Sequence, residues 1–195
     1  TSGFRETYGG IHLKYGIEPD IAVFGKALGN GYAITSVIGK RSVMEEAQNT
    51  FISSTFWTER IGPTAALKTL EIMQKEKSWE KITSIGNYLR RGWEMIAKDN
   101  DLPITISGIP SLSSFNFNSK NSLIFKTLIT QEMLKRGYLA SNACYTCIDH
   151  KENIIDSYLE NLEEVFVLIS KYKNHSSIGE LLDGPVCHSG FKRLN

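Results

Sequence analysis

Cysteine and long apolar runs are both scarce in this sequence. Three cysteines among 195 residues are too few, and of the wrong parity, for a disulfide framework. This indicates a reducing compartment, and we predict a cytoplasmic protein. No apolar run approaches the roughly 18 residues that a membrane span requires, and no signal-peptide pattern opens the sequence. The sequence therefore predicts no membrane partner.

An excess of one charge is also missing. Lysine and arginine together number 22 and aspartate and glutamate 21, so the formal net charge is +1 at pH 7. This near balance argues against a surface built to bind polyphosphate, and we expect no nucleic-acid partner. The hydrophobic content of 41% is enough for a sizeable core, and the length permits one large domain or two small ones.

Short apolar runs bounded by glycine fill the first quarter of the chain. Residues 21–24 and 34–38 are rich in β-branched side chains, which predicts two buried strands. Further on, apolar residues recur at helical spacing, which predicts a helix over 58–77 and a longer one over 78–98. The polar, turn-forming stretch at 99–103 marks the main domain boundary.

The remainder of the chain has the pattern of a small α+β unit. Its predicted elements are strands at 104–107 and 112–117, a helix at 122–136, a strand at 138–141, a helix at 151–173 and a weak helix near 178–182. We therefore predict three parts, with bounds at 1–77, 78–100 and 101–195.

Lys26 is the first candidate functional residue. It comes directly after an apolar run and Gly25, and Gly29 and Gly31 follow shortly afterwards. A lysine at the end of a buried strand, where the backbone lets a flat ligand approach closely, is how a Schiff-base lysine is presented. The alternative from these residues alone is a solvated loop lysine between two strands.

Three sequence blocks around this lysine resemble the class III, fold-type I aminotransferases, which use pyridoxal phosphate. The likeness is greatest to the branch that contains glutamate semialdehyde aminomutase. The blocks are TSGFR at 1–5, GIEPDI with FGKALGNG within 16–31, and SSTFW at 53–57 ahead of an alanine-containing helix. In that family the lysine of the Gly-Lys motif forms the internal aldimine, and Lys26 matches it. Thr55 matches the threonine that reaches the cofactor phosphate of the partner subunit.

The resemblance implies a fold, a cofactor and a reaction. The fold would be α/β: a partial large domain of the pyridoxal-phosphate transferase type, with a mixed sheet and helices, followed by a small α+β carboxy-terminal domain. Lys26 would hold pyridoxal phosphate, release it to a substrate amino group and then move a proton from the substrate carbon. Small-molecule amino donors and acceptors and a homodimer are implied as partners.

The substrate stays open at this point. The run SSTFWTERIGP indicates relatives that aminate sugar or short-chain aldehyde precursors of surface polysaccharides. An amino acid or a semialdehyde is the other option, and the reaction can be that of an aminotransferase or an aminomutase.

The resemblance also implies that part of the site precedes this chain. The family's aspartate that pairs with the pyridine nitrogen, its phosphate loop and its ring-stacking aromatic residue would all lie ahead of Thr1. We therefore expect a fragment, the second half of an enzyme, that is inactive alone. The alternative is a non-catalytic, truncated relative that serves as a structural or dimerisation partner.

Two further groups of residues could carry chemistry. Cys144 and Cys147 form a Cys-x-x-Cys pair with His150 close behind, but a structural zinc site needs four ligands and a redox pair normally opens a helix. We predict no metal here and two small buried side chains. Arg5 could clamp a substrate carboxylate, although an ion pair that pins the strand–loop junction is favoured.

Overall fold

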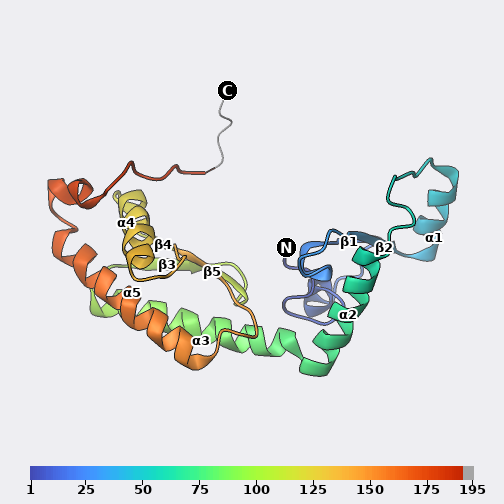
Figure 1. Ribbon diagram of the computed structural model, residues 1–195, viewed down its shortest axis with the longest axis horizontal. Helices are drawn as coiled ribbons and strands as arrows, with labels where there is room; N and C mark the ends of the chain where they lie inside the picture. The colour runs from blue at the N-terminus through green and yellow to red at the C-terminus, as the bar shows by residue number, and fades with distance from the viewer. Residues whose placement is uncertain (191–195) are drawn as a thin grey trace. The chain divides into compact units, whose positions relative to one another are not determined.

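The computed structural model describes residues 1–190, which form two units, Thr1–Thr83 and a second that begins at Ser84 (Figure 1). In chain order the elements are η1 (Ile11–Tyr15), β1 (Ile21–Phe24), η2 (Lys26–Leu28), β2 (Ser36–Gly39), α1 (Arg41–Met44), η3 (Glu45–Asn49), α2 (Ile61–Glu76), α3 (Ser78–Asp99), β3 (Ile104–Ser107), β4 (Leu112–Phe117), α4 (Ser122–Lys135), β5 (Ala143–Tyr145), α5 (Glu152–Tyr172) and η4 (Ser176–Leu181). Across residues 1–190, no helix combines the length and the apolar character needed to cross a membrane.

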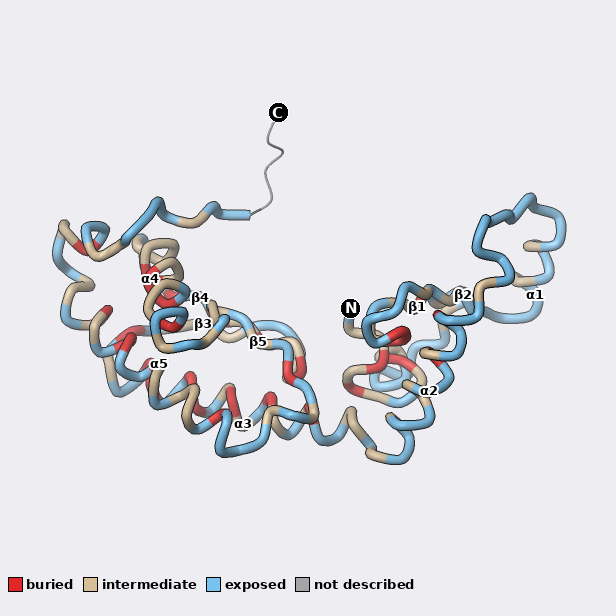
Figure 2. The backbone as a smooth tube through the Cα atoms, in the orientation of Figure 1, coloured by how far each residue is buried: buried red, intermediate tan, exposed pale blue. Residues whose placement is uncertain are grey.

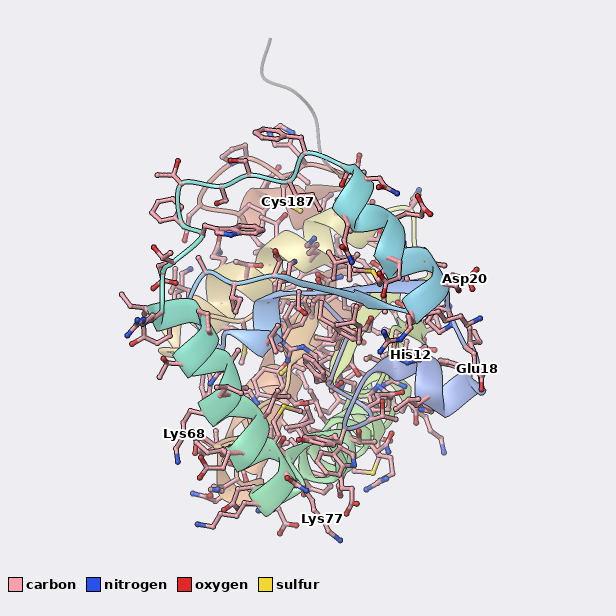
Figure 3. All side chains as sticks on the ribbon, turned by 90° about the vertical axis from the view of Figure 1, so that its right-hand side faces the viewer. His12, Glu18, Asp20, Lys68, Lys77 and Cys187 are labelled. Atoms are coloured by element: carbon pink, nitrogen blue, oxygen red, sulfur yellow. The ribbon has the colours of Figure 1, made fainter. Side chains whose placement is uncertain are left out.

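The first unit is built on two antiparallel strands and helix α2. Strands β1 and β2 pair with Ile21 opposite Gly39. Pro63 lies in the first turn of α2, where its missing N–H would have had no intrahelical partner. Lys68 projects outward from this helix, and Lys77 follows its last residue (Figure 3). A small core of Phe4, Phe24, Leu28 and Ala66 lies within the unit.

The prediction that these two strands are buried is wrong for the described residues. In β1 only Phe24 is buried, and Val23 is 69% exposed. In β2, Val37 and Ile38 are each 51% exposed. The small core of this unit contacts only the face of β1 that carries Ala22 and Phe24, so the alternate side chains remain open to solvent.

The second unit has a larger core between one sheet and three helices. Its sheet is antiparallel in the order β3-β4-β5, and the buried faces of α3, α4 and α5 are visible in Figure 2. Trp93 and Phe115 are fully buried and meet edge to face, with ring centroids 4.9 Å apart. The boundary between the two units, after Thr83, falls within helix α3. The division into three parts at 1–77, 78–100 and 101–195 stays a prediction.

One predicted strand of the second unit is misplaced. The sequence predicts a strand at 138–141, whereas β5 covers Ala143–Tyr145 and sets Cys144 opposite Ser113. Asn142 decides where pairing begins, because its carbonyl accepts from the Phe115 N–H at 2.9 Å and its Nδ2 donates to the Phe115 carbonyl at 2.7 Å. Tyr138 and Ala140 pack against the core instead of pairing with a strand.

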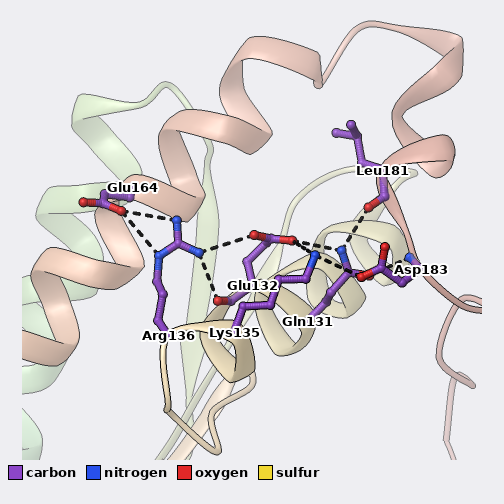
Figure 4. A network of polar contacts seen from close by, with 7 residues as sticks. All are labelled: Gln131, Glu132, Lys135, Arg136, Glu164, Leu181 and Asp183. Carbon is purple, nitrogen blue, oxygen red and sulfur yellow. Dashed lines mark hydrogen bonds and ion pairs between the residues drawn. The ribbon is translucent and has the colours of Figure 1, made fainter.

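Polar side chains join α4 to α5 and to the segment that follows α5. Arg136 lies between two carboxylates, with its Nη1 3.3 Å from Glu132 and its Nη2 3.2 Å from Glu164 (Figure 4). Lys135 pairs with Glu132 and with Asp183, each at 2.9 Å. Partial burial acts to raise the pKa of Glu132, but hydrogen bonds from Gln131 and Lys135 hold it below its usual value. These contacts fix the last described segment onto α4.

Candidate active site

Lys26 lies in a tight turn directly after β1. Its φ of 45° is in the left-handed region, which costs a residue other than glycine free energy and is concentrated at functional sites. The Leu28 N–H closes the turn by donating to the Gly25 carbonyl at 3.0 Å. Contrary to the expected burial, Lys26 is exposed, and no carboxylate or other acceptor within residues 1–190 contacts its ammonium. The turn thus presents an unpaired primary amine on a constrained backbone.

The backbone after Lys26 is closely packed. The Gly29 N–H donates to the Lys26 carbonyl at 3.2 Å, and the Tyr32 N–H donates to the Gly29 carbonyl at 3.1 Å. A Cβ at Gly29 would lie 2.0 Å from the Tyr32 carbonyl oxygen, so only glycine fits there. Leu28 holds the turn against the core of the first unit, because its side chain is 5% exposed and packs within that core.

Thr55 lies in the loop that precedes α2, and its side chain is exposed. Among the described residues, no hydrogen bond joins Thr55 to Lys26. The loop also exposes large apolar side chains: Phe51 is 95% exposed, Phe56 75% and Trp57 70%. Isolated apolar residues on a surface are ordinary, but a run of them in one loop is typical of an interface.

Glu59 fixes the start of α2, a role that the sequence interpretation missed. Its carboxylate accepts hydrogen bonds from the backbone N–H groups of Ile61 and Gly62, the second at 3.0 Å. An acidic side chain here satisfies N–H groups that have no intrahelical partner and interacts favourably with the helix dipole. An acidic residue four positions before a proline that lies in the first turn of a helix is the signal that could have identified it.

Arg5 and Glu6, neighbours in the amino-terminal segment, make different kinds of contact. The Nε of Arg5 donates to the Thr1 carbonyl at 3.1 Å. Glu6 has a side chain only 1% exposed and pairs with Lys14 at 2.5 Å, while its other oxygen, Oε1, is buried without a hydrogen-bond partner among the described residues. This part-buried ion pair was not anticipated, because Lys14 lies in the short helix η1, whose position beside Glu6 is decided by tertiary contacts.

The Cys-x-x-Cys pair straddles the end of β5. Cys144 is partly buried, and burial raises the pKa of its thiol to about 11, whereas Cys147 is exposed. The Cys147 N–H donates to Nδ1 of His150 at 3.4 Å. Within residues 1–190, no three His, Cys, Asp or Glu side chains are grouped as metal ligands. A thiol with a raised pKa is also a poor nucleophile, which argues against a redox role for Cys144.

The residues of the Lys26 turn fit pyridoxal phosphate. The cofactor's aldehyde requires an unpaired primary amine, and the Lys26 side chain supplies one. Gly29 lets the chain close tightly behind the lysine, because the space beside its Cα is taken by the Tyr32 carbonyl. The Thr55 hydroxyl has the donor chemistry that a phosphate oxygen takes.

Comparison with known proteins identifies the family. A sequence model described as aminotransferase class III matches residues 6–154. The chain therefore belongs to the class III aminotransferases, whose cofactor is pyridoxal phosphate. It is 28% identical over 176 residues to a 3-aminobutyryl-CoA aminotransferase from Cloacimonas acidaminovorans, covering 87% of this chain and 42% of that protein.

Solved structures of similar fold confirm the predicted α/β class. The FumI protein of Sphingopyxis sp., in its pyridoxal-phosphate internal aldimine form, matches with a TM-score of 0.80 and 23% identity, over 89% of this chain and 42% of that one. An omega-transaminase from Sphaerobacter thermophilus matches with a TM-score of 0.75 and 17% identity, over 87% and 43%. The chain thus spans less than half the length of the relatives that it matches.

Proposed function

We propose that Lys26 is the residue that binds pyridoxal phosphate covalently, in a protein that transfers amino groups between small molecules. The observation that carries the proposal is the exposed, unpaired Lys26 on a left-handed backbone between Gly25 and Gly29, in a chain of the class III family. The bound cofactor supplies an electron sink for the amino-bearing carbon of the substrate. Once displaced by the substrate's amino group, Nζ of Lys26 acts as the base that takes a proton from that carbon.

A homodimer is the second part of the proposal. In this dimer the Thr55 hydroxyl would donate to the cofactor phosphate of the partner subunit. The exposed Phe51, Phe56 and Trp57 in the same loop support this, because a second copy of the chain would remove their apolar surface from water. Measuring the mass of the purified protein in solution tests it, and a Trp57→Asp substitution should shift the equilibrium toward monomer.

The reaction class is the finer part of the proposal. An aminotransferase is favoured over an aminomutase of the glutamate semialdehyde type, because the relative at 28% identity is named an aminotransferase. Candidate acceptors are sugar or short-chain aldehydes, and amino acids or semialdehydes are the alternative. A cytoplasmic location is proposed with it. The discriminating assay offers the full-length protein each acceptor class together with a panel of amino donors.

Borohydride reduction followed by peptide mapping tests the lysine directly. The cofactor should be fixed to the peptide that contains Lys26, and Lys26→Ala should abolish the adduct. Lys77 is a matched control, because it is also exposed and also has a left-handed backbone, with φ of 47°. A protein in which Lys77→Ala abolishes the adduct while Lys26→Ala retains it would contradict the assignment.

The rival function is a non-catalytic structural or dimerisation partner. The observation that raises this alternative is that the match spans 42% of the 3-aminobutyryl-CoA aminotransferase. We therefore expect these residues, expressed by themselves with pyridoxal phosphate, to show no amino-group transfer. Turnover at rates typical of enzymes would show that this chain suffices for catalysis.

A further inference from the structure

A cavity of about 280 Å³ in the second unit has no role in the proposed reaction. It lies between the end of β4, the first turns of α4 and the segment that follows η4. Leu123 supplies an apolar side chain, and the edge of β4 at Phe115 and Phe117, whose rings are buried in the core, forms the floor. This volume is close to the lower limit of typical small-molecule sites, so it would accept a small ligand or one end of a larger one.

The charge of the cavity has one sign. Its polar lining includes Lys126 and His188, and no acidic residue lines it. Lys126 is partly buried, and within residues 1–190 no carboxylate pairs with it. Lys135 on the same helix differs, because it has two carboxylate partners at 2.9 Å. A partly buried ammonium without a counter-ion favours an anionic ligand.

Neutral donors complete the lining. Oδ1 of Asn116 accepts from Nδ2 of Asn142 at 3.4 Å, which leaves the amide nitrogen of Asn116 able to donate to a ligand. The hydroxyls of Ser122 and Ser189 also line the cavity. Amide and hydroxyl donors around one cation are the groups that bind carboxylate and phosphate oxygens.

The segment after η4 is held in place as one wall of the cavity. The Asp183 N–H donates to Oε1 of Gln131 at 2.7 Å, and the Leu181 carbonyl accepts from Nε2 of the same residue at 2.9 Å (Figure 4). Closer to the cavity, the Cys187 N–H donates to the Thr127 hydroxyl at 3.0 Å. These contacts fix the chain on both sides of Gly184 and so position His188.

We propose that this cavity binds a small oxyanion, the carboxylate or phosphate group of a compact organic molecule. Lys126 is its charge partner, Asn116 and His188 are donors, and Leu123 contacts the carbon part. The segment around Cys187 is the wall that closes the site. This inference is independent of the reaction proposed above, because it uses no residue of the Lys26 turn.

Titration of the purified protein with inorganic phosphate and, separately, with butyrate tests the site and distinguishes its two chemical sources. Nuclear magnetic resonance signals of Asn142 and His188 should shift saturably with at least one of the two anions. Lys126→Met should weaken that binding about tenfold or more, the effect of one charge-assisted hydrogen bond. The matched control is Lys120→Met, an exposed lysine ahead of α4, which should change the affinity by less than about twofold.

A second pair of variants tests the wall. Thr127→Val removes the acceptor of the Cys187 N–H and should weaken anion binding. Thr130→Val, one turn further along α4 and outside the cavity, should leave anion binding unchanged. No saturable shift at Asn142 and His188 with either anion in the unmodified protein would overturn the proposal. Equal losses in the two lysine variants would also overturn it, because they would indicate general attraction of anions to lysine.

Discussion

Replacing Gly29 by alanine tests whether the turn after Lys26 is as closely packed as the structure shows. The added Cβ would lie 2.0 Å from the Tyr32 carbonyl oxygen, whereas real Cβ contacts stay beyond 3.0 Å. The two groups must therefore separate by about 1 Å, and the obstructing atom is backbone, which no rotamer change can move. The φ of Gly29 is −86°, so alanine meets no conformational penalty of its own. The steric clash with the Tyr32 carbonyl is therefore the perturbation that the substitution introduces.

The expected cost follows from that displacement. Overpacking of a closely packed site costs about 1–3 kcal/mol, part of it through the hydrogen bond from the Tyr32 N–H to the Gly29 carbonyl. Urea unfolding followed by circular dichroism measures the loss. The Gly29 N–H also donates to the Lys26 carbonyl, so the lysine should move with the turn. A displacement of this size should slow covalent uptake of pyridoxal phosphate on the order of 10- to 100-fold.

Gly179→Ala is the matched control, since a Cβ there meets nothing within 4 Å. It should change the free energy of unfolding by less than about 0.5 kcal/mol and leave cofactor uptake unchanged. The reasoning is refuted if the two alanine variants unfold at the same urea concentration and take up the cofactor equally fast. Lost stability with unchanged uptake would retain the packing argument and remove the link to Lys26.

Three further predictions concern other parts of the chain. Iodoacetamide at pH 8 should alkylate the exposed Cys147 before Cys144, because a pKa of about 11 leaves Cys144 with on the order of 100-fold less thiolate than an ordinary cysteine. Equal alkylation rates of the two cysteines in peptide mass spectrometry would contradict this prediction. Burial raises the pKa of Tyr158, so the stability that its neutral hydroxyl contributes is present below about pH 10 and is lost as the pH rises through the higher pKa of the folded state. Tyr158→Phe should therefore reduce the fall of the melting temperature at alkaline pH. An unchanged fall would count against this prediction. Glu59→Ala removes both acceptors at the start of α2 and should destabilise the protein by about 1 kcal/mol in urea unfolding, whereas Glu163→Ala, an exposed position in the middle of α5, should not.

Patterns local in the sequence predicted most elements of the second unit. The strands at 104–107 and 112–117 have the predicted bounds, and the two amphipathic helices differ by only a residue or so at their ends. Their apolar side chains recur with the period of the element, so a single sequence contains the necessary information. The strand expected at 138–141 failed because pairing with β4, through Asn142, selected the next residues along.

The candidate site also combines features that the sequence predicted with features that only the structure shows. The glycines around Lys26 are a sequence signal, and they placed the lysine in a turn at the end of a strand, as the structure has it. Its left-handed φ and its exposure were not predictable, because they depend on how Leu28 and Tyr32 pack around the turn. Glu6 with Lys14 and the cavity beside Lys126 were missed for the same reason, since each joins segments that local periodicity does not relate.

The sequence by itself determined most of the helices and placed Lys26 in a glycine-flanked turn, because periodicity and glycine spacing act over a few residues. The α/β class and the choice of Lys26 as the functional lysine came from the resemblance of three sequence blocks to the class III family. Only the tertiary structure decided which strand residues pair, which carboxylate is buried and which lysine is left without a counter-ion. Those outcomes depend on groups far apart in the chain coming within hydrogen-bond distance, as when Asp183 meets Gln131. Burial and charge pairing are properties of that packing, and no local pattern encodes them.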